Sequence, residues 1–409
     1  MLMLAGLAVI AKFLKQSNLS ASLLAGIIFG FAELNERYDT RLGGEVIKTF
    51  TEFGMTFVLF FAGLSININE IYLKRMVPVA FWFMLLSGGF AAAVAYGAGL
   101  VETTSGITMF GLACAMCSKN LLYEYLEDEG EERSMHGMAM MCVSWFQDIV
   151  LLVCLAVVHA YKNSLVGMDT TERRAEPNTS AGSRRAVDLD KFGPTWPPQF
   201  NVYALGDNIG IALATLALVM LLHWILKKYF LKRAFRFFCQ EGELLFFGVM
   251  AYSLGTCALC FEANFSPVVS AYLSGFAISK LPSRVQVQQK ISSLRAFGIF
   301  LFHFMLGIYV KLDAHFFETD FPWALLLSCL IVVVNPIFMF VLGRFWCILP
   351  RTSIYLAMLS NNVGEHALIL ASLAYQAGIF EFRILQILVC ACIPEFDINA
   401  HCDNCDRRK

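Results

Sequence analysis

The chain has 409 residues, of which 58% are apolar and 15% are charged, and its mean hydropathy is +0.62. This composition is more apolar than a water-soluble domain requires, so it indicates several membrane-spanning helices. The formal net charge is −1, and no run of lysines and arginines resembles a nucleic-acid-binding arm. We therefore expect the lipid bilayer as a partner and no nucleic acid.

Apolar stretches separated by charged residues predict thirteen membrane-spanning helices, and hence an all-α polytopic membrane protein. The predicted segments are 1–14, 20–31, 50–66, 77–101, 106–122, 137–162, 205–230, 243–261, 266–279, 291–310, 321–345, 353–376 and 382–393. We expect helices one to six within 1–161, a polar loop at 162–203, helices seven to thirteen within 204–394 and a short cytosolic tail at 395–409.

Basic residues predict the orientation of these helices in the membrane, whether plasma membrane or endomembrane. The connection after the seventh segment is the richest in basic side chains, with Lys227, Lys228, Lys232, Arg233 and Arg236. We place this connection in the cytoplasm, so alternation puts the N-terminus outside or in a lumen and the C-terminus in the cytosol. The loop 162–203 then lies on the non-cytosolic side, where Asn178-Thr179-Ser180 is an acceptor pattern for N-glycosylation.

The 13 cysteines lie mostly inside apolar segments, where they are expected to be small packing residues. Cys402 and Cys405 have the spacing of a metal-ligand pair, but the sequence offers no second pair beside them. We therefore expect neither a metal site nor a cofactor.

Asp148 lies about halfway along the apolar segment 137–162. At a rise of roughly 1.5 Å per residue this segment crosses the ~30 Å hydrocarbon core, which places Asp148 near the bilayer midplane. A charged side chain there costs about 2.5–3.5 kcal/mol on insertion scales, and such residues usually face a wet cavity and carry ions or protons. The alternative is a protonated or paired carboxylate that only packs helices together.

Two other segments are polar in the middle. The stretch 114–120 includes Ser118 and Lys119, and the stretch 359–366 includes Asn361, Asn362 and Glu365. Interrupted spans at corresponding places in two halves point to the inverted repeats of a transporter, because unwound backbone and helix ends then face the substrate. Two kinked structural helices are the alternative, but together with Asp148 the pattern favours a transport site.

Two other classes of function need patterns that the sequence lacks. A channel requires a ring or filter of repeated ligands. An intramembrane hydrolase requires a second midplane aspartate, or a serine nucleophile with a histidine base. We therefore expect no enzymatic activity.

Several motifs along the chain resemble one known family. The densest group is Leu126-Glu127-Asp128, Gly130, His136-Gly137 and Phe146-Gln147-Asp148-Ile149. Weaker similarity lies in Glu52-Phe53-Gly54, Gly63-Leu64, Ala271-Tyr272-Leu273-Ser274-Gly275, Phe304-Met305-Leu306-Gly307, Lys311-Leu312-Asp313 and Gly364-Glu365-His366. In these motifs the chain resembles the Kef-type monovalent cation:proton antiporters, within the second cation:proton antiporter family.

The resemblance implies a sodium/proton antiporter-like fold, in which a core domain with two crossing broken helices slides against a dimerisation domain, as a homodimer. It also implies that Asp148 exchanges a proton for a cation. Gln147 stands where sodium-selective members carry a second Asp or an Asn, and the Gln-Asp pair goes with potassium. The expected function is thus antiport of a monovalent cation, K⁺ over Na⁺, against protons by alternating access.

Two positions depart from the family pattern. Lys119 stands where the family has a threonine, and Asn335 stands in the eleventh helix where the family has a lysine. We hypothesise that Lys119 takes over the role of that lysine and pairs with Asp148 when no cation is bound. Alternatively, Lys119 snorkels, binds helix-end carbonyls or holds Asp148 permanently, which would make the chain a non-transporting or channel-like relative.

The candidate residues also include three histidines in the predicted apolar segments, His223, His303 and His366. His223 and His303 lie on apolar faces and are expected to be packing or interfacial residues. Glu365 and His366 follow the glycine of the second interrupted segment, so a gate or proton-relay role and a packing role both stay open.

Overall fold

The computed structural model describes residues 18–30, 41–66, 70–101, 103–119, 122–123, 126, 130–131, 134–175, 202–238, 241–281, 283–308, 310, 316–360 and 364–392. Within these ranges every regular element is a helix. Seven helices are long and apolar enough to cross a membrane, and shorter apolar helices occupy Thr104–Cys114, Pro267–Ser279 and Phe382–Cys392. The prediction of an all-α polytopic membrane protein is thus confirmed, whereas the predicted segment 1–14 lies outside the described residues.

The helices follow one another in the order of the predicted apolar segments. Their bounds are α2 Asn18–Phe29, α4 Arg41–Leu64, α5 Glu70–Gly97, α6 Thr104–Cys114, α8 Met135–Ala175, α9 Val202–Leu226, α10 Lys232–Phe238, α11 Gly242–Glu262, α12 Pro267–Ser279, α13 Arg284–Ile308, α14 Phe321–Phe345, α15 Pro350–Leu359 and α16 Glu365–Gln376. A π-helical turn, Lys227–Leu231, joins α9 to α10, and a second one, Phe316–Asp320, precedes α14.

Several helices are longer than the apolar segments that predicted them. α4, α5 and α13 each begin in a polar stretch before the apolar run, and α8 continues past Lys162 to Ala175, into the stretch expected to be loop. Hydrophobicity marks only the part of a helix inside lipid. Outside lipid, Glu, Lys, Arg and Gln are good helix formers, so the helix goes on into water until a breaker arrives. Pro177 is the first such residue after α8.

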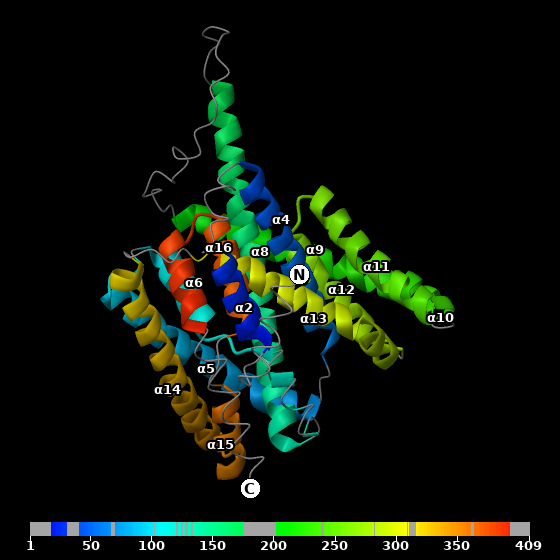
Figure 1. Cartoon of the computed structure of the whole chain (residues 1–409). Coiled ribbons are helices and arrows are strands. Elements are labelled where there is room, and N and C mark those ends of the chain that lie inside the picture. Colours follow the sequence, from blue (N-terminus) through cyan, green and yellow to red (C-terminus); the bar gives the residue numbers. More distant parts are fainter. Residues whose placement is uncertain are drawn as a thin grey trace.

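The helices form two bundles that meet along α8. In the first bundle α5, α6, α8, α14, α15 and α16 pack on one another, and in the second α2, α4, α9, α11, α12 and α13 do so. α8 contacts α9 and α12 of the second bundle. In Figure 1, α14 and α15 lie at the left and α10 and α11 at the right, with α8 between them. A group on α8 can therefore contact both bundles at once.

Glycines set the close approach of α4 and α12 inside the second bundle. A Cβ on Gly63 would lie 2.1 Å from the carbonyl oxygen of Tyr272, and a Cβ on Gly275 would lie 2.0 Å from that of Phe60. Both distances are shorter than any real contact, so the two backbones touch only because these residues lack side chains. This packing holds Tyr272 and Ala62, the residue before Gly63, at the boundary with the first bundle.

Candidate functional site

Two helices of the first bundle are broken, and their interruptions cross. α6 ends at Cys114 and the chain runs without helix through residues 115–118, while α15 ends at Leu359 and α16 begins at Glu365. The backbone N–H of Gly364 donates to the carbonyl oxygen of Met116 at 3.3 Å. A Cβ on Gly364 would lie 2.2 Å from the Cα of Ser118, so only glycine fits at the crossing. The two interruptions predicted from polar residues are thereby confirmed.

Gln147 of α8 binds the backbone of the unwound segment after α6. Its Oε1 accepts from the backbone N–H of Cys117 at 3.2 Å, and its Nε2 donates to the carbonyl oxygen of Ala115 at 3.1 Å. The Cys117 thiol in turn contacts the Ser360 carbonyl oxygen at 3.5 Å. Because an unwound segment loses its helical hydrogen bonds, the amide of Gln147 supplies the partners that the buried backbone needs.

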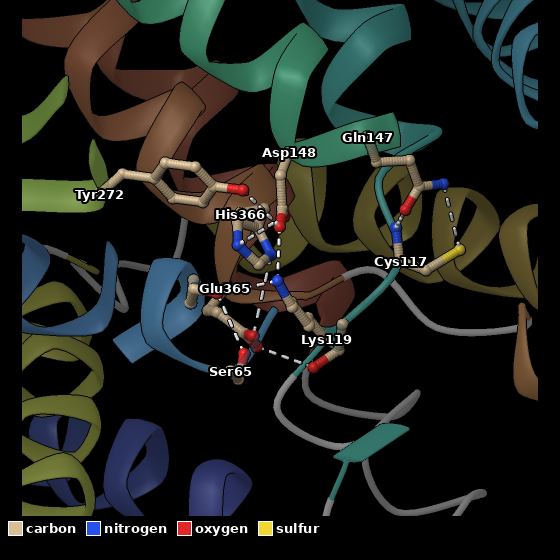
Figure 2. Close-up of polar contacts among 10 residues, drawn as sticks. Ser65, Cys117, Lys119, Gln147, Asp148, Tyr272, Glu365 and His366 are labelled. Atoms are coloured by element: carbon tan, nitrogen blue, oxygen red, sulfur yellow. Dashed lines mark hydrogen bonds and ion pairs between the residues drawn. The ribbon is translucent and has the colours of Figure 1, made fainter. Parts of the chain in front are cut away.

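Asp148 lies at the boundary between the two bundles and is 2% exposed. Three polar side chains from three different segments surround its carboxylate (Figure 2). The ammonium of Lys119 and the hydroxyl of Tyr272 donate to Oδ2 at 2.5 and 3.0 Å. Nε2 of His366 lies 3.4 Å from Oδ1. The carboxylate is therefore buried and ion-paired, which agrees with the predicted pairing of Lys119 with Asp148.

Lys119 also reaches across to the second bundle. Its Nζ donates to the carbonyl oxygen of Ala62, in the last turn of α4, at 2.9 Å. Lys119 is itself only 2% exposed, so the structure contradicts the alternative in which it snorkels to the membrane surface. The helix-end carbonyl and the carboxylate both bind the ammonium. Lys119 and Tyr272 thus form polar links between the bundles at Asp148.

Glu365 opens α16 on the other side of the crossing. Its Oε2 accepts from the hydroxyl of Ser118 at 2.7 Å, and its Oε1 lies 3.8 Å from Nδ1 of His366. Glu365 is fully buried, with a relative exposure of 0%. A carboxylate at the first position of a helix is stabilised by the unpaired N–H groups there, which offsets part of the penalty of burial. Two carboxylates, one ammonium and one imidazole therefore share a single buried cluster.

The sequence matches the family described as "Sodium/hydrogen exchanger, transmembrane" over residues 1–398. The chain belongs to the sodium/hydrogen exchanger family. This is a family of cation/proton antiporters and not of enzymes, which excludes the intramembrane hydrolase considered above. The Kef-type resemblance is borne out as well, since the relatives include potassium efflux antiporters.

Two such relatives are the K⁺ efflux antiporters 1 and 2, chloroplastic, of Arabidopsis thaliana. They are each 22% identical to this exchanger-family chain, over 90% and 83% of its length. The chain spans only 28% and 27% of the length of these two proteins. Among solved structures, that of the sodium proton antiporter MjNhaP1 from Methanocaldococcus jannaschii at pH 8 matches with a TM-score of 0.61 at 16% identity, covering 99% of this chain and 95% of that one. The antiporter fold is therefore shared.

The exchanger fold brings together four of the eight residues predicted from the sequence to bind ions or protons. Asp148, Lys119, Ser118 and Glu365 belong to the buried cluster. Gln147, expected beside the ion, instead bonds the unwound backbone. Three predicted residues, Asn178, Asn361 and Asn362, lie outside the described residues.

Asn335 of α14 lies at the end of α6 and not at the carboxylate. Its Nδ2 donates to the carbonyl oxygen of Cys114 at 3.4 Å, and its Oδ1 accepts from the hydroxyl of Ser87 on α5. A lysine at this position would face the unpaired carbonyls at the C-terminal end of α6. The amide of Asn335 satisfies one of those carbonyls without bringing a charge.

Sequence reasoning missed Tyr272 as a site residue and left His366 undecided. Tyr272 stands in the motif Ala271–Gly275 that carries part of the family resemblance, but nothing in that motif marks the tyrosine as a partner of Asp148. Its contact depends on the glycine-mediated approach of α4 and α12, which the sequence does not reveal. The sequence feature that pointed to a role for His366 was its position just after the glycine of the second interrupted segment.

Proposed function

We propose that this chain exchanges a monovalent cation, K⁺ in preference to Na⁺, for protons by alternating access, with Asp148 as the cation site. The observation that carries the proposal is the buried carboxylate of Asp148, placed between two helix bundles and paired with the ammonium of Lys119. An incoming cation replaces the ammonium as the counter-charge of the carboxylate, so the carboxylate never stands bare in a low-dielectric site.

Access alternates when the two bundles shift relative to each other. The Tyr272 hydroxyl on α12 and the Ala62 carbonyl on α4 belong to the second bundle, and they bind Asp148 and Lys119 of the first. A shift of the bundles breaks both links and leaves the carboxylate and ammonium together on the first bundle. We propose that this movement carries the site from one side of the membrane to the other, within a fold of about thirteen helices and a homodimer, as the family resemblance implies. The oligomer is tested by the mass of the purified chain in detergent, where a monomer at all concentrations contradicts it.

The preference for K⁺ rests on the field at the site. A single carboxylate binds a large, weakly hydrated cation more readily than a small one, because it offers little to replace the tightly held water of Na⁺ or Li⁺. The similarity to proteins named as K⁺ efflux antiporters agrees with this preference. Because the Gln147 amide is engaged with backbone, it contributes to selectivity only through the shape of the crossing.

We predict that proteoliposomes holding the chain and a pH-sensitive dye release protons faster on addition of K⁺ than of Na⁺ or Li⁺ at the same concentration. The ranking follows from the dehydration penalty, which grows as the cation becomes smaller. Choline chloride is the matched control for ionic strength. A ranking with Li⁺ or Na⁺ first contradicts the preference while leaving antiport intact, and no response to any cation contradicts antiport itself.

One observation favours a second function, that of a non-transporting relative. Lys119 makes two buried polar contacts, to Asp148 and to the Ala62 carbonyl. It therefore blocks the access of a cation to the carboxylate from the side of the second bundle. If the ammonium is never displaced, the pair is a fixed strut between the bundles. The two functions differ in one measurement, the binding of cations to the purified protein, which the strut does not allow.

We propose the orientation with a cytosolic C-terminus. Arg284 at the start of α13 bonds the carbonyl of Ser65 after α4, and Arg75 near the start of α5 bonds that of Cys347 after α14. These basic residues therefore lie at ends of helices that alternation assigns to one membrane side. The positive-inside rule makes that side cytosolic, which places the stretch between α8 and α9 opposite.

We expect Asn178→Gln to abolish a glycosidase-sensitive mass shift when the chain is expressed in eukaryotic cells. Asn178 is an acceptor only if its loop reaches the lumen. Asn201→Gln, in the same stretch but outside an acceptor pattern, should keep the shift. Modification by a membrane-impermeant thiol reagent from the cytosolic side, at a cysteine placed at position 178, contradicts the orientation.

A further inference from the structure

His366 is a buried imidazole with one nitrogen turned toward the carboxylate of Asp148. The residue is 3% exposed, and its Nε2 lies 3.4 Å from Oδ1 of Asp148, within ion-pair range. Nε2 makes no hydrogen bond with any described residue. Its Nδ1 faces Oε1 of Glu365 at 3.8 Å. The ring thus stands between two carboxylates, in the first turn of α16 (Figure 2).

The groups around this imidazole carry more negative charges than positive ones. Asp148 comes from α8, Glu365 from α16 itself, Lys119 from the segment after α6, and the neutral hydroxyl of Tyr272 from α12. His303 of α13 interacts electrostatically with Glu365. With both carboxylates ionised, one ammonium faces two negative charges. A buried cluster is most stable when its charges balance, so one more positive charge is favoured there.

Either a proton or an alkali cation supplies that charge, and the geometry gives them different places. The proton belongs on the imidazole, because Nε2 has a carboxylate oxygen within reach and is otherwise without a hydrogen bond among the described residues. The cation belongs at the carboxylate of Asp148, on the side from which the ammonium of Lys119 withdraws. Proton and cation are then alternatives, because the cluster favours one additional positive charge and disfavours two.

We propose that His366 is a proton-binding site of the exchange cycle and that the Glu365 carboxylate stabilises its protonated form. The exchanged proton then dissociates from the His366 imidazolium and not from the carboxyl group of Asp148. This rests on the proposed function, whose cation site it leaves at Asp148. When a cation binds beside Asp148, the N–H bond at Nε2 of the imidazolium breaks. The electron pair stays on the nitrogen and the proton passes to water on the open side. When the cation leaves, the imidazole takes up a proton again, and the charge of the cluster is the same in both states.

The test is the number of protons released when K⁺ binds to the purified full chain in weakly buffered detergent solution. The wild type should release about one proton for each K⁺ bound, since linked sites exclude each other in both directions. His366→Gln keeps a side chain of similar length that does not titrate, so it should bind K⁺ with proton release reduced to a small fraction of the wild-type value. Glu365→Gln should keep the release but move its midpoint to lower pH, because the imidazolium loses a neighbouring negative charge.

His223→Gln is the matched control. His223 is another buried histidine, 4% exposed, whose Nδ1 bonds the Val219 carbonyl on α9 in the second bundle. Its replacement should leave proton release unchanged. Release from His366→Gln equal to that of the wild type overturns the inference and leaves the imidazole as a packing residue. Absence of K⁺ binding by the wild type overturns the proposed function instead. If His366→Gln does not fold, the titration of the His366 ring followed by NMR in the wild type decides, because added K⁺ must then remove its proton.

Discussion

Replacement of Asp148 by asparagine should abolish cation-driven proton movement, reducing the rate in proteoliposomes to that of protein-free vesicles. The amide carries no charge to balance a cation within the buried site. It also removes the negative charge beside Nε2 of His366, so the imidazolium loses the partner 3.4 Å away that stabilises it. Both the cation and the proton therefore lose their place. Exchange by this variant at the wild-type rate would remove Asp148 from the mechanism.

The same replacement leaves Lys119 buried without its carboxylate, and this needs a control. Removing one partner of a buried ion pair typically destabilises a protein by about 3–5 kcal/mol, because an uncompensated charge remains. A loss of exchange could then result from unfolding of the variant and not from the loss of the carboxylate as a cation site. The variant that combines Asp148→Asn with Lys119→Met removes both charges, so its melting temperature should recover relative to Asp148→Asn alone. Exchange should stay absent, which separates the role of the carboxylate in transport from its role in stability.

The sequence predicted the site to the extent that polar residues inside apolar segments are unusual. Asp148 and the two interrupted spans stand out because lipid penalises an exposed carboxylate or an unpaired backbone, so their presence requires a protein-lined interior. The helix ends were harder to predict. Where a helix continues beyond its apolar segment, as α8 does past Lys162, hydrophobicity no longer reports on secondary structure.

The positions of Gln147 and Tyr272 show what a one-dimensional pattern lacks. Adjacent residues on an α-helix point about 100° apart, since one turn holds 3.6 residues. Gln147 and Asp148 therefore face different neighbours: the amide meets the unwound backbone at Cys117, and the carboxylate meets the second bundle. Which helix provides each neighbour follows from the crossing and from glycine-mediated packing. Tyr272 reaches Asp148 for that reason, although 124 positions separate them.

The final prediction concerns Lys119 and Asn335, the two positions at which the resemblance implies a threonine and a lysine. We propose that Lys119 performs the task of the lysine that Asn335 replaces, by balancing the charge of Asp148 between cations. Lys119→Thr restores the family hydroxyl but leaves the carboxylate without an ammonium. We expect exchange to fall and thermal stability at neutral pH to drop by several degrees, since a buried pair is broken.

Adding Asn335→Lys to Lys119→Thr should recover exchange, because the lysine side chain is longer than the Asn335 amide, which ends at the Cys114 carbonyl, and extends from α14 toward the carboxylate of Asp148. Asn335→Lys alone is the matched control: it places a second ammonium near a site that already holds one, so cation binding should weaken by like-charge repulsion. The proteoliposome rates of these three variants and the wild type decide between the two functions considered. Recovery in the double variant supports the substitution of one lysine for the other. If the wild type is silent and Lys119→Thr alone transports, Lys119 is the strut that locks the bundles together, and the chain is a non-transporting member of its family.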